Sequence, residues 1–272
     1  MRCGNCGLVQ LNPVPEPGAQ ADFHSSHYDG AAPPERLAKM SPEHSRKRLY
    51  SPKYQKWAAG QLRDLAARVS PPRSAPLRLL EVGAASGGIL NAARGLGMIP
   101  TGVEVSAEAA AFGINELKLD IRVGLVEEMN LPAGGFDILI LQDVIEHVPS
   151  PASLMKECTR LLAPGGVIYI HTVNVESRTA AEAGKEFFLA DATGGHVVLF
   201  SPETLGRHAA STGLRVLETT TGGYRIMQRE CDRAAVRGLK RRWVRLRENI
   251  GHRLVRNTLR GHFVTVIAQK PL

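Results

Sequence analysis

Small residues and a separate acid lie where a nucleotide could bind. The apolar run Leu79–Val82 leads into Gly83-Ala84-Ala85-Ser86-Gly87-Gly88, where a strand is expected to turn into a helix. Small side chains let a ligand approach the backbone closely, and the start of a helix offers N–H groups without partners. Glu104, at the end of the next expected strand, can accept hydrogen bonds from both hydroxyls of a ribose. These residues predict a nucleoside-binding turn.

The same turn leaves two alternatives open. A dinucleotide-binding fold also has an acid about 20 residues after its glycines, which would make the chain an NAD(P)-dependent oxidoreductase. Its G-x-G-x-x-G fingerprint is not matched, because Ala85 stands at the second glycine. The other alternative is a tight structural turn with a surface glutamate.

Histidines suited to acid–base chemistry follow several of the expected strands. His147 comes after the strand 136–141, His171 ends the strand 167–172, and His196 lies in a glycine-containing approach to Phe200. Imidazole is an effective base near neutral pH, so each of the three could take a proton from a hydroxyl group. Packing or helix capping is an equally good interpretation of any one of them.

The elements that would position these residues alternate along the chain. Apolar runs at strand length are seen at 77–82, 99–105, 121–123, 136–141, 167–172, 214–219 and 263–268. Helical patterns lie between them and at 52–69, before the proline-rich linker 70–76. Such alternation predicts an α/β fold, a three-layer sandwich with a mainly parallel sheet, whose ligand crevice lies at the carboxyl ends of the strands.

The region from about Leu77 to Ala268 resembles the class I S-adenosylmethionine-dependent methyltransferases, particularly the bacterial group with the ubiquinone-pathway O-methyltransferases. The similar blocks are Glu81–Gly87, Glu104, Phe136–Val148, Arg160–Gly166 and Gly195–Leu205. The resemblance implies a Rossmann-like seven-stranded sheet with an antiparallel last strand. It also implies a transferase that uses S-adenosyl-L-methionine.

The resemblance assigns the cofactor site residue by residue. Glu104 would hold the ribose, residues 124–127 would flank the adenine, and Gln142 would face the donor methyl group. The implied cofactor-binding residues are Glu81, Gly83, Ala84, Ala85, Gly87, Glu104, Val105, Leu125, Val126, Glu127, Gln142 and Asp143. Two positions depart from the family pattern, since Ala85 replaces a usual glycine and Leu125 stands where an acid is frequent.

The expected reaction is in-line methyl transfer to an oxygen of a small-molecule or glycan-type acceptor. Alignment of the acceptor with the donor methyl group can supply most of the barrier reduction in such a displacement, and no metal ion is expected. The expected catalytic residues are His147, His196 and Asp143, with His147 the first choice of base. Methylation of nitrogen or carbon, and a non-catalytic adaptor, are alternatives. Asp143, Glu146 and His147 also resemble an acid–histidine cluster that holds a divalent ion in some relatives.

Both ends of the chain add segments whose roles are open. Residues 1–42 look like a partial zinc-ribbon-like segment before a methyltransferase domain at 43–272, but zinc prefers four ligands and Cys3 and Cys6 supply two. His24 and His27 could complete the set, although an empty, vestigial knuckle is favoured.

The net charge of +8 is concentrated in residues 224–262, a basic segment with an apolar stripe at helical spacing. A packed helical insertion is favoured there over a weak contact with an anionic membrane or polyanion, and no nucleic-acid motif is evident. The longest apolar runs fall far short of the ~20 residues of a membrane span, and no signal peptide is apparent, so a cytoplasmic location is expected. The sequence does not indicate an oligomeric state.

Overall fold

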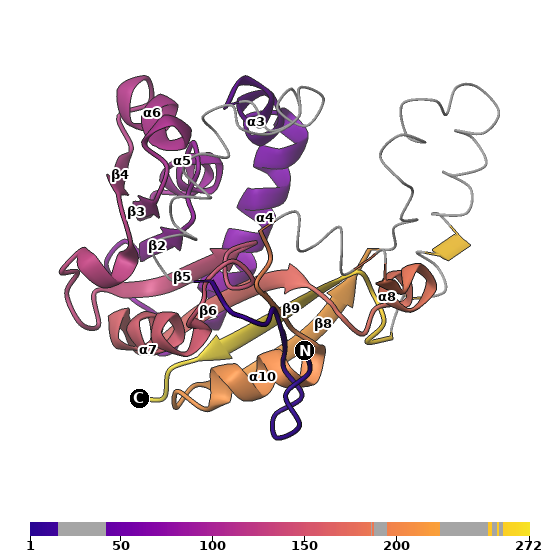
Figure 1. The fold of residues 1–272 in the computed structure, drawn as a ribbon. Helices are drawn as coiled ribbons and strands as arrows, with labels where there is room; N and C mark the ends of the chain where they lie inside the picture. The colour runs from indigo at the N-terminus through magenta and orange to yellow at the C-terminus, as the bar shows by residue number, and fades with distance from the viewer. Residues whose placement is uncertain (16–41, 186, 188–194, 224–249, 252–254, 256–257) are drawn as a thin grey trace.

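The computed structural model describes residues 1–15, 42–185, 187, 195–223, 250–251, 255 and 258–272. Its centre is a seven-stranded sheet in the order β4-β3-β2-β5-β6-β9-β8 (Figure 1). The strands are β2 (Arg78–Val82), β3 (Ile99–Glu104), β4 (Asp120–Val123), β5 (Phe136–Gln142), β6 (Leu162–Val173), β8 (Arg215–Gly222) and β9 (Phe263–Gln269). The pairs from β4 to β6 are parallel, and β9 is antiparallel to both of its neighbours. The expected α/β fold with a mainly parallel sheet and an antiparallel last strand is confirmed.

Helices cover both faces of this sheet, giving three layers. On one face lie α4 (Pro52–Arg68), α5 (Gly88–Gly95) and α6 (Ala107–Asn115), and on the other lie α7 (Pro151–Leu161) and α10 (Pro202–Ala210) (Figure 1). The shorter helices are α3 (Pro42–Leu49), η1 (Val126–Glu128) and α8 (Arg178–Ala183). Of the described helices, none combines the length and the apolar composition that crossing a membrane requires.

Alternation along β5 explains why this strand lies in the middle of the sheet. Leu139 and Leu141 point into the core beneath α7 and α10, whereas Ile138 and Ile140 point into the core beneath α4 and α5. All four side chains are at most 3% exposed. A strand buried on both faces must be apolar at every position, which is why its sequence shows a continuous run.

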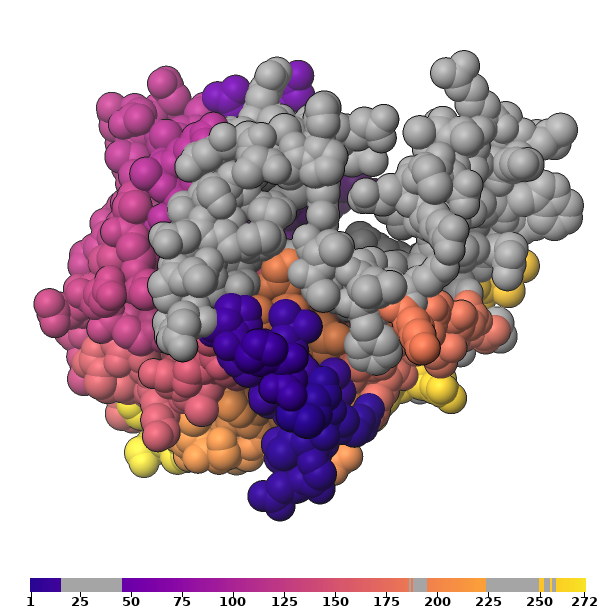
Figure 2. Space-filling model, viewed as in Figure 1, coloured from indigo at the N-terminus to yellow at the C-terminus, as the bar shows by residue number. Residues whose placement is uncertain are grey.

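The N-terminal segment contributes a second, smaller sheet. Strand β1 (Val9–Gln10) pairs antiparallel with β7 (Val198–Leu199), which directly precedes α10. We call residues 1–12 the N-terminal arm. Figure 2 shows the arm, in indigo, as a ridge on the surface of the molecule.

Several sequence predictions fall outside the described residues. His24, His27 and nearly all of the basic segment 224–262 are among them. Cys3 and Cys6, which lie within the description, have free thiols. The favoured interpretations, an empty vestigial knuckle in the arm and a packed helical insertion in the basic segment, therefore stay predictions, as do their alternatives.

Candidate active site

The turn between β2 and α5 has a backbone that requires small residues. Gly83 and Gly87 adopt φ angles of 76° and 82°, and Ala85 between them has a φ of 46°. A Cβ on Gly83 would lie 2.4 Å from the Cγ2 atom of Val144, in the loop that follows β5. The turn thus packs directly against the end of β5, where the expected catalytic residues begin, and a larger residue at position 83 would separate them.

Glu104 reaches from the end of β3 to this turn. Its Oε2 accepts a hydrogen bond from the Ala85 N–H at 2.8 Å, and its Oε1 accepts one from the Ser106 N–H at 3.0 Å. Burial raises the pKa of Glu104, and the bonds from Ser106 and Ala85 oppose that rise. A carboxylate has about four acceptor positions, so both oxygens keep capacity for the hydroxyls of a ribose. The geometry fits a nucleoside at this turn.

Glu81 places a second acid beneath the same turn. Its side chain is 5% exposed, and Oε2 has no hydrogen-bond partner among the described residues. Burial raises the pKa of Glu81 well above 4.5, and the nearby charge of Glu104 raises it further. Buried polar atoms in native proteins nearly always find a partner, so this oxygen fits a polar or cationic group of a bound ligand.

Replacing Glu81 with Gln is expected to stabilise the ligand-free protein near neutral pH. Because the folded-state pKa is raised, the unfolded chain loses its proton first as the pH rises above 4.5, and this change favours unfolding. Glu81→Gln has no proton to lose, so it avoids this loss of stability, and it keeps the size of the side chain. The free energy of unfolding, measured in urea at pH 4 and at pH 7.5, should exceed the wild-type value mainly at pH 7.5. A difference that is equal at both pH values would contradict the buried-acid interpretation.

The residues expected to flank an adenine follow β4. The Gly124 N–H donates to the backbone oxygen of Glu104 at 2.9 Å, which brings this loop beside the end of β3. The Val126 side chain is 2% exposed and packs in the core, so only its backbone could contact a base. Leu125 and Glu127 flank it along the chain, at the start of η1.

The carboxyl end of β5 opens onto a cavity beneath α4. It is a shallow hollow, partly open to solvent, whose empty space, open solvent included, is about 250 Å³. Its lining residues are Trp57, Ala58, Gln61, Leu62, Leu65, Ile89, Ile140, Gln142 and Tyr169. Asp143 follows Gln142 with a φ of 56°, a strained backbone conformation for a residue other than glycine. Such strain often accompanies functional sites.

The structure brings His147 and His196 together. Their ring centroids are 4.6 Å apart in an edge-to-face arrangement, and Nδ1 of His147 lies 3.1 Å from the Gly195 carbonyl oxygen. A carbonyl oxygen can only accept, so Nδ1 carries the proton and the neutral ring has its lone pair on Nε2. One ligand atom each from Glu146, His147 and His196 lies within 4.8 Å of the others, a set that could hold a metal ion. The metal-binding alternative considered from the sequence included Asp143 with Glu146 and His147, whereas in the structure the third member of this set is His196.

Asp143 has a different histidine for a neighbour. The Asp143 N–H donates to the His171 carbonyl oxygen at 2.9 Å. Burial lowers the pKa of His171, and the charge of Asp143 opposes this change. Asp143 also contributes to the raised pKa values of Tyr54 and Tyr169, after the larger effect of burial. The candidate residues therefore form two groups, one around Asp143 just after β5 and one around His147 and His196. The two tyrosines were missed by sequence analysis, because nothing in their spacing links them to a site.

Comparison with known proteins identifies the family of this chain. A family model described as a methyltransferase domain matches residues 54–219, more than half of the chain. The chain belongs to the class I S-adenosylmethionine-dependent methyltransferases.

Two curated relatives have the same name. The methyltransferase is 31% identical over 158 residues to a "Ubiquinone biosynthesis O-methyltransferase" of Thiobacillus denitrificans, covering 54% of this chain and 68% of that protein. It is 29% identical over 164 residues to the Coxiella burnetii protein of that name, covering 57% of this chain and 70% of the relative.

A solved structure supports the fold. An Archaeoglobus fulgidus S-adenosylmethionine-dependent methyltransferase superimposes with a TM-score of 0.54 at 17% identity, covering 83% of this chain and 98% of that one. The predicted family, fold and cofactor are thus confirmed.

Proposed function

We propose that this methyltransferase methylates an oxygen atom of a small-molecule acceptor, with His147 as the base. The observation that carries the proposal is the contact of His147 with His196 and with the Gly195 carbonyl, which assigns the ring proton to Nδ1 and the lone pair of the neutral ring to Nε2. A hydroxyl group gains from proton removal as it attacks, whereas a neutral amine does not need it. The two relatives are named as O-methyltransferases, which supports oxygen as the acceptor atom.

S-adenosylmethionine supplies an activated methyl group on a sulfonium sulfur. In this proposal Glu104 holds the ribose hydroxyls, and the backbone of the turn from Gly83 to Gly87 lies along the nucleoside. Glu81 offers its buried oxygen to a polar group of the same ligand. Gln142 and Asp143 face the space between cofactor and acceptor, where they orient the acceptor and exclude water. His147 takes the acceptor proton, and His196 supports its ring.

The acceptor atom is tested with a panel of model compounds. Purified protein is incubated with methyl-labelled S-adenosylmethionine and a phenol, an amine, a carbon acid or a sugar, and label transfer is measured. Transfer to the phenol or the sugar supports O-methylation and separates the small-molecule interpretation from the glycan-type one. Transfer to the amine or the carbon acid alone would replace the proposal with N- or C-methylation.

Replacing Glu104 with Ala is expected to weaken binding of S-adenosylhomocysteine by about 10- to 100-fold. Hydrogen bonds to a charged group contribute about 1.5–3 kcal/mol, and every 1.4 kcal/mol changes a dissociation constant about tenfold. Isothermal titration calorimetry gives the constant directly. Glu116→Ala, which removes an exposed carboxylate at the end of α6, is the control and should leave binding unchanged. An unchanged affinity in Glu104→Ala would refute the ribose assignment.

A further inference from the structure

We propose that the N-terminal arm positions His196 against His147, so that the arm acts as a positioning element for the proposed base although it lies outside the methyltransferase sheet. The inference rests on the proposed function for its catalytic meaning. Its structural claim, that backbone pairing by the arm fixes the two imidazole rings, is tested separately.

The arm forms backbone hydrogen bonds with the segment that follows His196. In the β1–β7 pair, Val9 lies opposite Leu199 and Gln10 lies opposite Val198. The Leu11 N–H donates to the Val197 carbonyl oxygen at 2.9 Å, which extends the pairing to the residue next to His196. The arm thus fixes the backbone immediately after this histidine.

The loop after β5 holds the same chain through other bonds. The backbone oxygen of Glu146 accepts hydrogen bonds from the N–H groups of Val197 and Val198, at 2.8 and 3.1 Å. On the other side of His196, the Gly195 carbonyl oxygen lies 3.1 Å from Nδ1 of His147. Residues 195–199 therefore lie between the arm and the loop that carries His147. Because a two-residue strand pair is weak by itself, the orientation of His196 depends on both sets of bonds.

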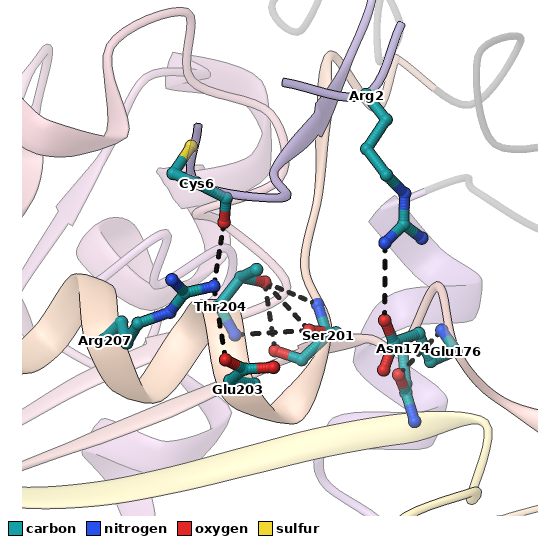
Figure 3. A network of polar contacts seen from close by, with 8 residues as sticks. All are labelled: Arg2, Cys6, Asn174, Glu176, Ser201, Glu203, Thr204 and Arg207. Carbon is teal, nitrogen blue, oxygen red and sulfur yellow. Dashed lines mark hydrogen bonds and ion pairs between the residues drawn. The ribbon is translucent and has the colours of Figure 1, made fainter. Parts of the chain in front are cut away.

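Contacts farther along the arm anchor it to the domain (Figure 3). The Arg207 guanidinium, on α10, donates to the Cys6 carbonyl oxygen at 2.9 Å, and Arg2 forms an ion pair with Glu176 at 3.5 Å. The ion pair is half exposed and contributes little. Leu8 and Leu11 also pack against the core beneath α7 and α10, which adds apolar contact to the backbone pairing. Docking at these points keeps β1 beside β7.

The decisive experiment removes one hydrogen bond from the arm. Leu11→Pro lacks the N–H that donates to Val197, whereas Leu11→Ala keeps that N–H and loses only the side chain. The ring protons of His147 and His196 are followed by NMR in histidine-labelled protein, with assignments from His147→Gln and His196→Gln. In the wild type, edge-to-face contact at 4.6 Å should shift these signals through the ring current of the other imidazole.

We expect the shift to persist in Leu11→Ala and to disappear in Leu11→Pro. Amide hydrogen exchange at residues 197–199 should accelerate about tenfold or more in Leu11→Pro, because their local opening becomes easier. A variant without residues 1–12 should behave as Leu11→Pro does, and it replaces that variant if the proline prevents folding. Wild-type ring signals in both variants, or equal loss in the proline and alanine variants, would overturn the inference.

Cofactor binding separates this inference from the proposed function. The cofactor turn is held by its own bonds, such as that from Ala85 to Glu104, so Leu11→Pro should bind S-adenosylhomocysteine within about twofold of the wild type. Failure of the wild type to methylate any oxygen acceptor would defeat the proposed function and leave the ring signals as a test of the arm. Lost ring contact together with an unchanged rate on the phenol would defeat the catalytic role of the arm.

Discussion

Gly165→Ala should lower the free energy of unfolding by about 3 kcal/mol or more, a loss typical of severe backbone strain and steric conflict. Gly165 has a φ of 72°, and a Cβ there would lie 1.5 Å from the Ser70 carbonyl oxygen. That oxygen belongs to the backbone, so no side-chain rotation can relieve the overlap. The Ser70 N–H also donates to the Gly165 carbonyl oxygen at 3.0 Å, and any movement apart would break this bond.

Gly213→Ala is the matched control. Gly213 has a φ of 89°, but no atom lies within 4 Å of the position that a Cβ would take. It should therefore cost only the left-handed backbone penalty of about 1–2 kcal/mol. Urea unfolding gives both free energies, and similar losses in the two variants would show that the contact with Ser70 is not the cause.

The contact of Gly165 with Ser70 could not be predicted from the sequence. The run Pro164-Gly165-Gly166 predicts a turn before the strand 167–172, but the structure includes this run in β6, where the pairing with β5 shifts register between Phe136 and Ile138. The need for glycine comes from Ser70, far away in the sequence, and only the docked linker shows it. Spacing along a chain reports local conformation but not which distant backbone packs against it.

The middle of the sheet could be predicted because central strands such as β5 are buried on both faces. Apolar runs such as 136–141 contrast with the turns around them, and the β2–α5 turn and Glu104 follow consecutive parallel strands. The carboxyl ends of such strands meet at one edge, so their proximity follows from the topology. The N-terminal arm was not predicted to pair, because β1 and β7 have two residues each, too few to show a period.

The contact between His147 and His196 could be predicted only in part. Sequence reasoning placed His147 and His196 at the same edge, but their contact depends on hydrogen bonds from Val197 and Val198 to Glu146. The proximity of Asp143 to His171 depends on the register of β5 and β6, in which Gln142 lies opposite His171. A single sequence predicts neither the register of two strands nor the hydrogen bonds by which one loop packs against another.

His147→Gln should lower kcat by about 10²- to 10⁴-fold, the usual contribution of general acid–base catalysis. Glutamine keeps a polar side chain of similar length at this position, but its amide cannot take a proton from the methyl acceptor. The rate is measured with the phenol of the acceptor panel across pH 5 to 9. The acid limb that a histidine base produces should be lost in the variant, while the affinity for S-adenosylhomocysteine stays within about twofold of the wild type.

His171→Gln distinguishes His147 from its strongest rival. His171 is the histidine beside Asp143, and burial lowers its pKa, so as a base it would stay neutral and active to lower pH than an exposed histidine. If His147 is the base, His171→Gln should retain most of the wild-type kcat and the shape of the pH profile. A large loss in His171→Gln with a near-normal rate in His147→Gln would move the proton transfer to the Asp143 group, beside the cavity beneath α4.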